Sequence, residues 1–155
     1  IIHIGSPKTG SSAIQRFCLN NREALSKHGF FYPKHDFDSN QVTSGHASLA
    51  HFIAQEKEAA ARSIFKEYRD QANQHKKTLL LSSEVFFRYP EFTKKITGDT
   101  SVRLIAFVRH PIDLTISLHN QAIKRHFGTH TLIEHCSKVA SRTNTQYAAT
   151  ILHRW

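Results

Sequence analysis

The first twelve residues constrain the fold most, because they join a short isoleucine-rich run to a glycine-containing loop and then to a helical pattern. Residues 1–4 read Ile-Ile-His-Ile, which suits a buried strand, and residues 5–10 read Gly-Ser-Pro-Lys-Thr-Gly. A strand that passes through such a loop directly into a helix gathers backbone N–H groups and a helix N-terminus around one point. The segment therefore predicts an anion-binding loop on an α/β fold.

The position of the lysine narrows the kind of anion. Gly5 and Gly10 match the spacing of the triphosphate-binding motif G-x-x-x-x-G-K-[ST], in which a lysine follows the second glycine. Here Ser11 follows Gly10, and the one lysine of the loop is Lys8. The backbone cradle is kept, whereas the residue that contacts a magnesium-bound triphosphate is displaced. A P-loop kinase or nucleotidase is therefore the less favoured interpretation.

Length and composition indicate one globular domain over residues 1–155. The hydrophobic fraction is 39% and the charged fraction 21%, which are ordinary values. The chain starts at Ile1, contains no Met and stops at Trp155 within a helical pattern, so we expect the domain to be truncated or incompletely recorded at its C-terminus. No apolar stretch reaches the length of a membrane span and no signal peptide is visible. This predicts a bacterial cytoplasmic protein, the alternative being the trimmed lumenal domain of a membrane-anchored enzyme.

The charge balance indicates anionic ligands. The chain has 21 Lys and Arg against 12 Asp and Glu, a net charge of +9, and such a field raises the local concentration of anions. The basic residues are spread along the whole chain, with no basic tract interleaved with aromatic residues, which argues against nucleic acid. A small polyanionic cofactor is the favoured partner, and the sequence carries no signal of oligomeric state.

Strand and helix patterns alternate along the chain. Buried strands are expected at 1–4, 78–81 and 102–108, with a short extended piece at 30–32. Helices are expected at 11–28, 47–54, 57–75, 90–96, 112–126, 131–139 and 145–155. This alternation predicts a three-layer α/β/α fold with a mainly parallel sheet covered on both faces.

Polar clusters follow three of the expected strands. They are Lys8–Ser12, Ser82–Glu84, and Arg109 with the helix that it precedes. Ligands of parallel sheets bind beyond the carboxyl ends of the strands, so we expect the three clusters to converge on one edge and form an active site.

Two of these segments resemble sulfotransferases that use 3′-phosphoadenosine 5′-phosphosulfate (PAPS). Residues 3–15, HIGSPKTGSSAIQ, resemble their 5′-phosphosulfate loop, and residues 108–121, VRHPIDLTISLHNQ, resemble their 3′-phosphate site. In that site an Arg ending a strand and a Ser eight residues later hold the phosphate, the spacing of Arg109 and Ser117. Residues 147–155 are similar to a helix of bacterial carbohydrate-type members. The resemblance covers most of the chain and implies a P-loop nucleotide-hydrolase-like fold.

The resemblance also implies an activity, the transfer of a sulfuryl group from PAPS to a hydroxyl or amine, leaving 3′,5′-ADP. The acceptor is expected to be a carbohydrate or a lipid-linked molecule, and no metal is expected. Lys8 would neutralise charge that develops at the transferring group. The residues expected to bind the cofactor are Lys8, Thr9, Gly10, Ser11, Ser12, Arg109 and Ser117. A non-catalytic nucleotide- or polyanion-binding module remains the alternative from another class.

Two residues compete for the role of catalytic base. Glu84 follows the middle strand, where the family places an acidic or histidine base, although a carboxylate there also suits the start of a helix. His46 lies in a histidine-rich stretch and is the rival base, with a partly buried histidine at a helix start as its structural alternative. The histidines at 126, 130 and 135 match no zinc spacing, so no metal site is predicted.

Overall fold

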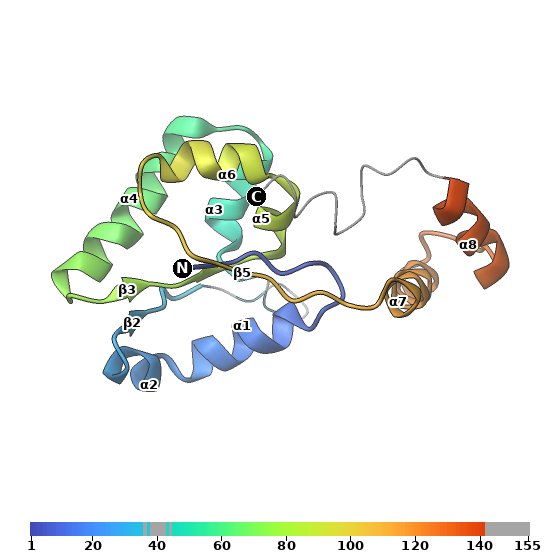
Figure 1. Cartoon of the computed structure of the whole chain (residues 1–155), viewed down its shortest axis with the longest axis horizontal. Coiled ribbons are helices and arrows are strands. Elements are labelled where there is room, and N and C mark those ends of the chain that lie inside the picture. Colours follow the sequence, from blue (N-terminus) through green and yellow to red (C-terminus); the bar gives the residue numbers. More distant parts are fainter. Residues whose placement is uncertain (36, 38–42, 44, 142–155) are drawn as a thin grey trace.

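A computed structural model of the chain describes residues 1–35, 37, 43 and 45–141. The fold is mixed α/β (Figure 1). The elements are β1 (Ile2–His3), α1 (Ser11–Asn20), α2 (Arg22–Lys27), β2 (Phe30–Phe31), α3 (Ala47–Ala54), α4 (Glu58–Gln74), β3 (Thr78–Leu79), β4 (Leu81–Ser82), α5 (Glu84–Arg88), α6 (Pro90–Thr97), β5 (Leu104–Ile105), α7 (Pro111–Lys124) and α8 (Leu132–Ser141).

The strands pair in parallel, as the sequence predicts. One sheet has the order β4-β1-β5, with Ile2 of the central strand opposite Leu81 on one side and Leu104 on the other. A second sheet pairs β2 with β3, also in parallel. Since Leu80 alone separates β3 from β4, the extended segment 78–82 belongs to both sheets. β1 is thus the central strand of its sheet, and the loop that follows it leaves from the middle of the sheet edge.

Helices lie on both sides of these strands. α1 and α2 lie on one side and α3 to α6 on the other (Figure 1). The apolar core joins β1 and β4 to the second group of helices; its largest members include Ile4, Leu49, Phe65, Leu81 and Phe86. In α4, Ala61, Phe65 and Ala72 are buried at four- and seven-residue intervals, the spacing of one helical face. The expected helix at 47–54 matches α3, and that at 57–75 matches α4 within a residue at each end.

Three local predictions need correction. The helix expected over 11–28 is interrupted at Asn21, whose side-chain amide donates to the carbonyl of Phe17 at 2.8 Å and so competes with helix continuation. The strand expected over 78–81 changes partner strand at Leu80. The expected helices also omit α5, which starts at Glu84, where a carboxylate suits a helix start. Ser83 caps α5, its hydroxyl accepting a hydrogen bond from the amide of Val85.

The strand expected over 102–108 is too long, and the sheet is not covered on both faces at this edge. Only Leu104–Ile105 pair with β1, and Phe107 and Val108 are 47% and 65% exposed. Among the described residues no strand pairs with the outer side of β5. α7 and α8 lie beyond the end of the sheet and contact each other (Figure 1), so they do not cover it.

The remaining predictions divide between confirmed elements and residues outside the described ranges. α7 and α8 confirm the helices expected at 112–126 and 131–139 to within two residues. The helix expected at 145–155 lies outside the described residues, and so does most of the polar stretch 35–45, in which the sequence shows no helix or strand pattern. Across the part of the chain that is described, no helix has the length and apolar character needed to cross a membrane.

Candidate functional site

The loop between β1 and α1 leaves the start of the helix open. Lys8 and Gly10 adopt left-handed conformations, with φ of 64° and 86°, and such residues turn successive N–H groups of a loop toward one concavity. Gly10 occupies the N-cap position without a side-chain cap, and the first turn of α1 contains no acidic residue. The first N–H groups of a helix have no partner within it, so this terminus is suited to an external anion.

The second polar cluster contacts this loop directly. Glu84 begins α5 just after β4, and the hydroxyl of Ser11 donates a hydrogen bond to its Oε1. Ser11 is buried and Glu84 is half-buried. The register of the sheet explains the contact, because β1 and β4 are parallel neighbours whose carboxyl ends lie side by side.

The third cluster reaches the loop from the other neighbouring strand. Nη1 of Arg109 donates to the carbonyl of Lys8 at 3.2 Å, although 101 residues separate the two in sequence. Arg109 is exposed and Ser117, on α7, is half-buried. The three polar clusters therefore meet at the carboxyl edge of the strands, as the alternation of elements predicts.

A cavity of about 570 Å³ lies beside the loop, within the roughly 300–1,000 Å³ typical of small-molecule sites. We call it the loop cavity. Its walls come from the loop, α1, α5 and α7, with Thr43 from the segment before α3. Of the predicted site residues, Lys8, Gly10, Ser11, Ser12 and Glu84 line it. Among the other predicted residues, Thr9 stays within the loop and donates its hydroxyl to the carbonyl of Ser6 at 2.6 Å, while Arg109 and Ser117 lie outside the lining.

Sequence reasoning missed several residues of the loop cavity. Gln15 is 1% exposed and lines the cavity, and its side-chain nitrogen, Nε2, has no hydrogen-bond partner among the described residues. Arg88 and Arg125 also line it. The signal that would have found two of them is helical spacing, since Gln15 follows Ser11, and Arg88 follows Glu84, by four residues on the same helix face.

His46 lies inside the core and does not line the loop cavity. It is 1% exposed, its Nδ1 accepts a hydrogen bond from the amide of Ser82 at 3.0 Å, and its Nε2 lies 3.2 Å from the carbonyl of Pro33. Burial, followed by the nearby His35, lowers the pKa of His46 to about 3. Its neutral ring holds the end of β4 in place, and both nitrogens are occupied by backbone groups.

A second histidine supports the same serine from β1. His3 is 3% exposed, and its Nδ1 lies 2.7 Å from the hydroxyl of Ser82. Burial lowers the pKa of His3, and its Nε2 has no hydrogen-bond partner within the part of the chain that the structure describes. The turn from β4 into Glu84 therefore rests on two buried, uncharged imidazoles.

Gly45 fits this packing because of its close approach to β4. Its φ is 66°, and a Cβ atom placed there would lie 2.0 Å from the carbonyl oxygen of Ser82. The same approach lets the amide of His46 donate to that oxygen at 2.9 Å. Glycine is therefore required here to bring His46 against the strand.

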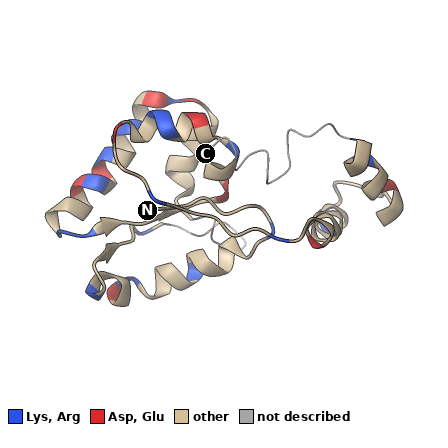
Figure 2. Cartoon of the chain, in the orientation of Figure 1, with Lys and Arg blue, Asp and Glu red and all other residues tan. Residues whose placement is uncertain are grey.

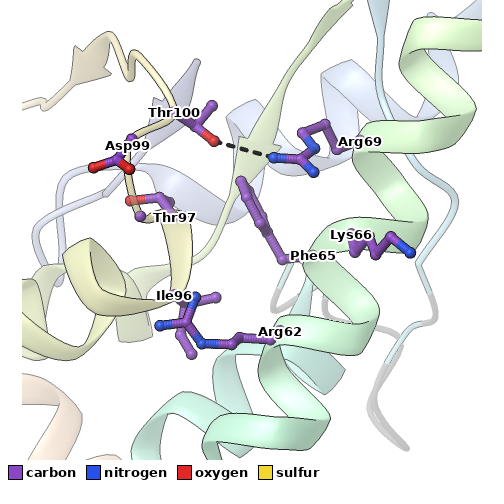
Figure 3. Close-up of a pocket in the computed structure, with 9 residues that line it drawn as sticks. Arg62, Phe65, Lys66, Arg69, Ile96, Thr97, Asp99 and Thr100 are labelled. Carbon is purple, nitrogen blue, oxygen red and sulfur yellow. Dashed lines mark hydrogen bonds between the residues drawn. The ribbon is translucent and has the colours of Figure 1, made fainter.

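A second cavity, of about 610 Å³, lies between α4, α6 and residues 97–100 (Figure 3). We call it the α4–α6 cavity. Arg62, Lys66 and Arg69 line it from successive turns of α4, with Phe65 and Ile96 as apolar neighbours. Arg62 pairs with Glu58 at 2.9 Å, and Arg69 donates to the hydroxyl of Thr100 at 3.3 Å.

Comparison with known proteins gives no identification. No protein-family model, curated protein or solved structure matches the chain. Within the described ranges, no group of three or more His, Cys, Asp and Glu side chains is arranged to hold a metal ion. The function must therefore be argued from the site itself.

Proposed function

We propose that the chain is a sulfotransferase domain that moves a sulfuryl group from PAPS to a hydroxyl or amine of a carbohydrate or lipid-linked acceptor. The proposal includes the fold: we propose that the chain has a three-layer, P-loop nucleotide-hydrolase-like architecture. One observation carries it: the loop cavity combines an open helix N-terminus, a lysine and a carboxylate. Anion binding, charge neutralisation and proton removal are the three tasks of such a transfer.

The residues of the loop fit a 5′-phosphosulfate. The backbone N–H groups of Thr9, Gly10, Ser11 and Ser12 would hold its phosphate at the positive end of α1. Gln15 lines the same wall, but its Nε2 is enclosed beside Gly45 and is out of reach of a ligand, so the fit rests on the loop itself.

Lys8 and Glu84 take the chemical roles. PAPS supplies a sulfuryl group whose bond to the bridging phosphate oxygen breaks as the acceptor oxygen or nitrogen bonds to sulfur. The ammonium of Lys8 neutralises negative charge on oxygens in the cavity. The carboxylate of Glu84 accepts the proton of the acceptor, and the hydroxyl of Ser11 fixes its orientation. We prefer Glu84 to His46 as the base because Glu84 lines the cavity and His46 is enclosed in the core.

Arg109 is proposed to hold the 3′-phosphate together with Ser117. One N–H of its guanidinium is used by the carbonyl of Lys8, which leaves further donors of the planar fork for a phosphate. This bond also links the two ends of the nucleotide site, because the residue that would contact the 3′-phosphate supports the backbone of the lysine at the 5′ end.

A non-catalytic polyanion-binding module is the second candidate, and the Ser11–Glu84 bond favours it. A carboxylate held by a hydroxyl is what a purely structural link between α1 and α5 would look like. The two functions differ in what the loop cavity should bind and in whether Glu84 is needed for turnover.

Titration calorimetry with 3′,5′-ADP, 5′-AMP and ATP–magnesium tests the proposal. We expect 3′,5′-ADP to bind best and without metal. Arg109→Ala should remove most of the preference for 3′,5′-ADP over 5′-AMP, about a tenfold effect for one charge-assisted contact. Arg69→Ala, in the α4–α6 cavity, is the matched control and should leave both affinities unchanged. Equal or tighter binding of ATP–magnesium would refute the sulfotransferase assignment.

A further inference from the structure

We propose that Arg88 and Arg125 form an anion subsite in the loop cavity that recognises a carboxylate or sulfate group on the acceptor. The inference rests on the proposed function and narrows it from any hydroxyl or amine compound to an acidic one. It adds two residues to the site that neither the loop motif nor the resemblance points to.

The two arginines enter the same cavity from different elements. Arg88 is in the last turn of α5, four residues after Glu84, and Arg125 directly follows α7, four residues after Gln121. Both side chains line the loop cavity, together with Lys8. The elements that carry the arginines are separated in sequence by α6 and β5, so the cavity collects its positive charge from distant segments.

The positive charge of the cavity is not balanced from within. Among the described residues, its lining contains three cations, Lys8, Arg88 and Arg125, against one carboxylate, that of Glu84. Glu84 accepts its hydrogen bond from the hydroxyl of Ser11. Across the described ranges, neither guanidinium forms an ion pair with a carboxylate. An anionic ligand is the partner that this imbalance favours.

The location of Arg88 indicates that this positive charge binds the acceptor rather than the cofactor. The proposed cofactor contacts already include Lys8 and the start of α1 at the 5′ end, and Arg109 at the 3′ end. Arg88 shares a helix face with Glu84, the group that must reach the reacting hydroxyl for proton transfer. Positive charge beside the base therefore lies where the acceptor sits. A planar guanidinium binds carboxylate and sulfate oxygens in pairs, so an acidic saccharide is the class of acceptor that the cavity fits.

A charge-matched pair of double variants tests the subsite. Arg88→Gln with Arg125→Gln removes two charges from the loop cavity, and Arg62→Gln with Lys66→Gln removes two from the α4–α6 cavity. Binding of a hyaluronan hexasaccharide, which carries uronates, and of neutral chitohexaose is measured by calorimetry in the presence of saturating 3′,5′-ADP. We expect the acidic probe to bind at least tenfold tighter than the neutral one, and the loop-cavity variant alone to lose that preference.

The outcomes separate this inference from the proposed function. If 3′,5′-ADP binds but the two double variants lose the acidic probe equally, the subsite is refuted and the sulfotransferase proposal stands. If the loop-cavity variant also loses more than fivefold in 3′,5′-ADP affinity, the arginines belong to the cofactor and the subsite is again refuted. If 3′,5′-ADP fails to bind while the acidic probe still depends on Arg88 and Arg125, the subsite is supported and the cofactor assignment fails.

Discussion

The two basic cavities of this protein differ in almost everything except size and charge. Each is lined by three Lys or Arg side chains, and their volumes are about 570 and 610 Å³. The loop cavity lies at the start of α1, where N–H groups point outward, whereas the α4–α6 cavity lies at the end of α6, where carbonyl groups do. The start of α1 thus favours an anion in the first cavity, although α5 and α7 also end at its wall, and the end of α6 opposes one in the second.

The side chains reinforce this difference. In the α4–α6 cavity Arg62 and Arg69 already have partners, and Asp99 adds negative charge. Figure 2 shows Lys and Arg alternating with Asp and Glu along α4, the pattern of a solvated helix face. In the loop cavity the side chains of Arg88 and Arg125 make no hydrogen bond or ion pair within the described part of the chain. Cationic donors without partners, rather than volume or net charge, distinguish the loop cavity.

Removing a lysine from each cavity should give the largest difference. Lys8→Ala should lower the rate of sulfuryl transfer by about 10³-fold, because a charge aimed at the transferring group is lost. Lys66→Ala, in the α4–α6 cavity, should leave the rate unchanged. Transfer is followed with ³⁵S-labelled PAPS and an acidic oligosaccharide. Normal turnover by Lys8→Ala would show that the loop lysine has no part in the chemistry.

Exchanging one carboxylate in each cavity tests the base. Glu84→Gln keeps an oxygen that accepts from Ser11 while removing the proton acceptor, so turnover should fall about 10²-fold with 3′,5′-ADP affinity nearly unchanged. Asp99→Asn is the control in the α4–α6 cavity and should have no effect on either quantity. A Glu84→Gln protein with full activity would leave the carboxylate a structural role only, as in the non-catalytic alternative.

The sequence predicts the parts of this site that depend on local pattern and strand order better than the parts that depend on how the helices are oriented. The loop, the open start of α1 and the meeting of Lys8, Glu84 and Arg109 follow from local pattern and parallel topology, both of which a sequence displays. Arg88 and Arg125 were missed because they lie one helical turn beyond the motif residues. The four-residue spacing after Glu84 could have indicated Arg88, whereas no motif residue on α7 had been shown to face the cavity. The failed strand at 102–108 has a similar cause, since an apolar run predicts a strand and not the presence of a second neighbour.

The role of His46 depends on tertiary packing. In the sequence, this histidine fits either a base near a substrate or a partly buried residue at a helix start. The structure agrees with the second and encloses it between Tyr32, His35 and the end of β4. That enclosure changes its chemistry, because burial stabilises the neutral imidazole.

The last difference between the cavities concerns the buried residues that support them, and the pH dependence of the free energy of unfolding should reveal it. The turn that carries Glu84 into the loop cavity follows Ser82, which is held by the buried imidazoles of His3 and His46, whereas the apolar side chains Phe65 and Ile96 line the α4–α6 cavity. The pKa of His46 is about 3 in the folded protein. Below about pH 6.5 the imidazole therefore binds a proton in the unfolded chain but stays neutral in the folded one. Stability is therefore greatest above pH 6.5 and falls as the pH decreases, by about 2 kcal/mol between pH 7.5 and 5 for this one group.

Urea denaturation at pH 7.5 and 5.0 measures this loss, and His46→Gln should remove most of it. His28→Gln changes an exposed histidine and should leave the loss intact. Ring NMR signals of the unaltered protein provide a check that needs no variant, since the imidazole of His46 should not titrate between pH 7.5 and 5. A titration midpoint near 6.5 would contradict the enclosure of His46, and with it the argument that His46 positions β4 while Glu84 faces the ligand.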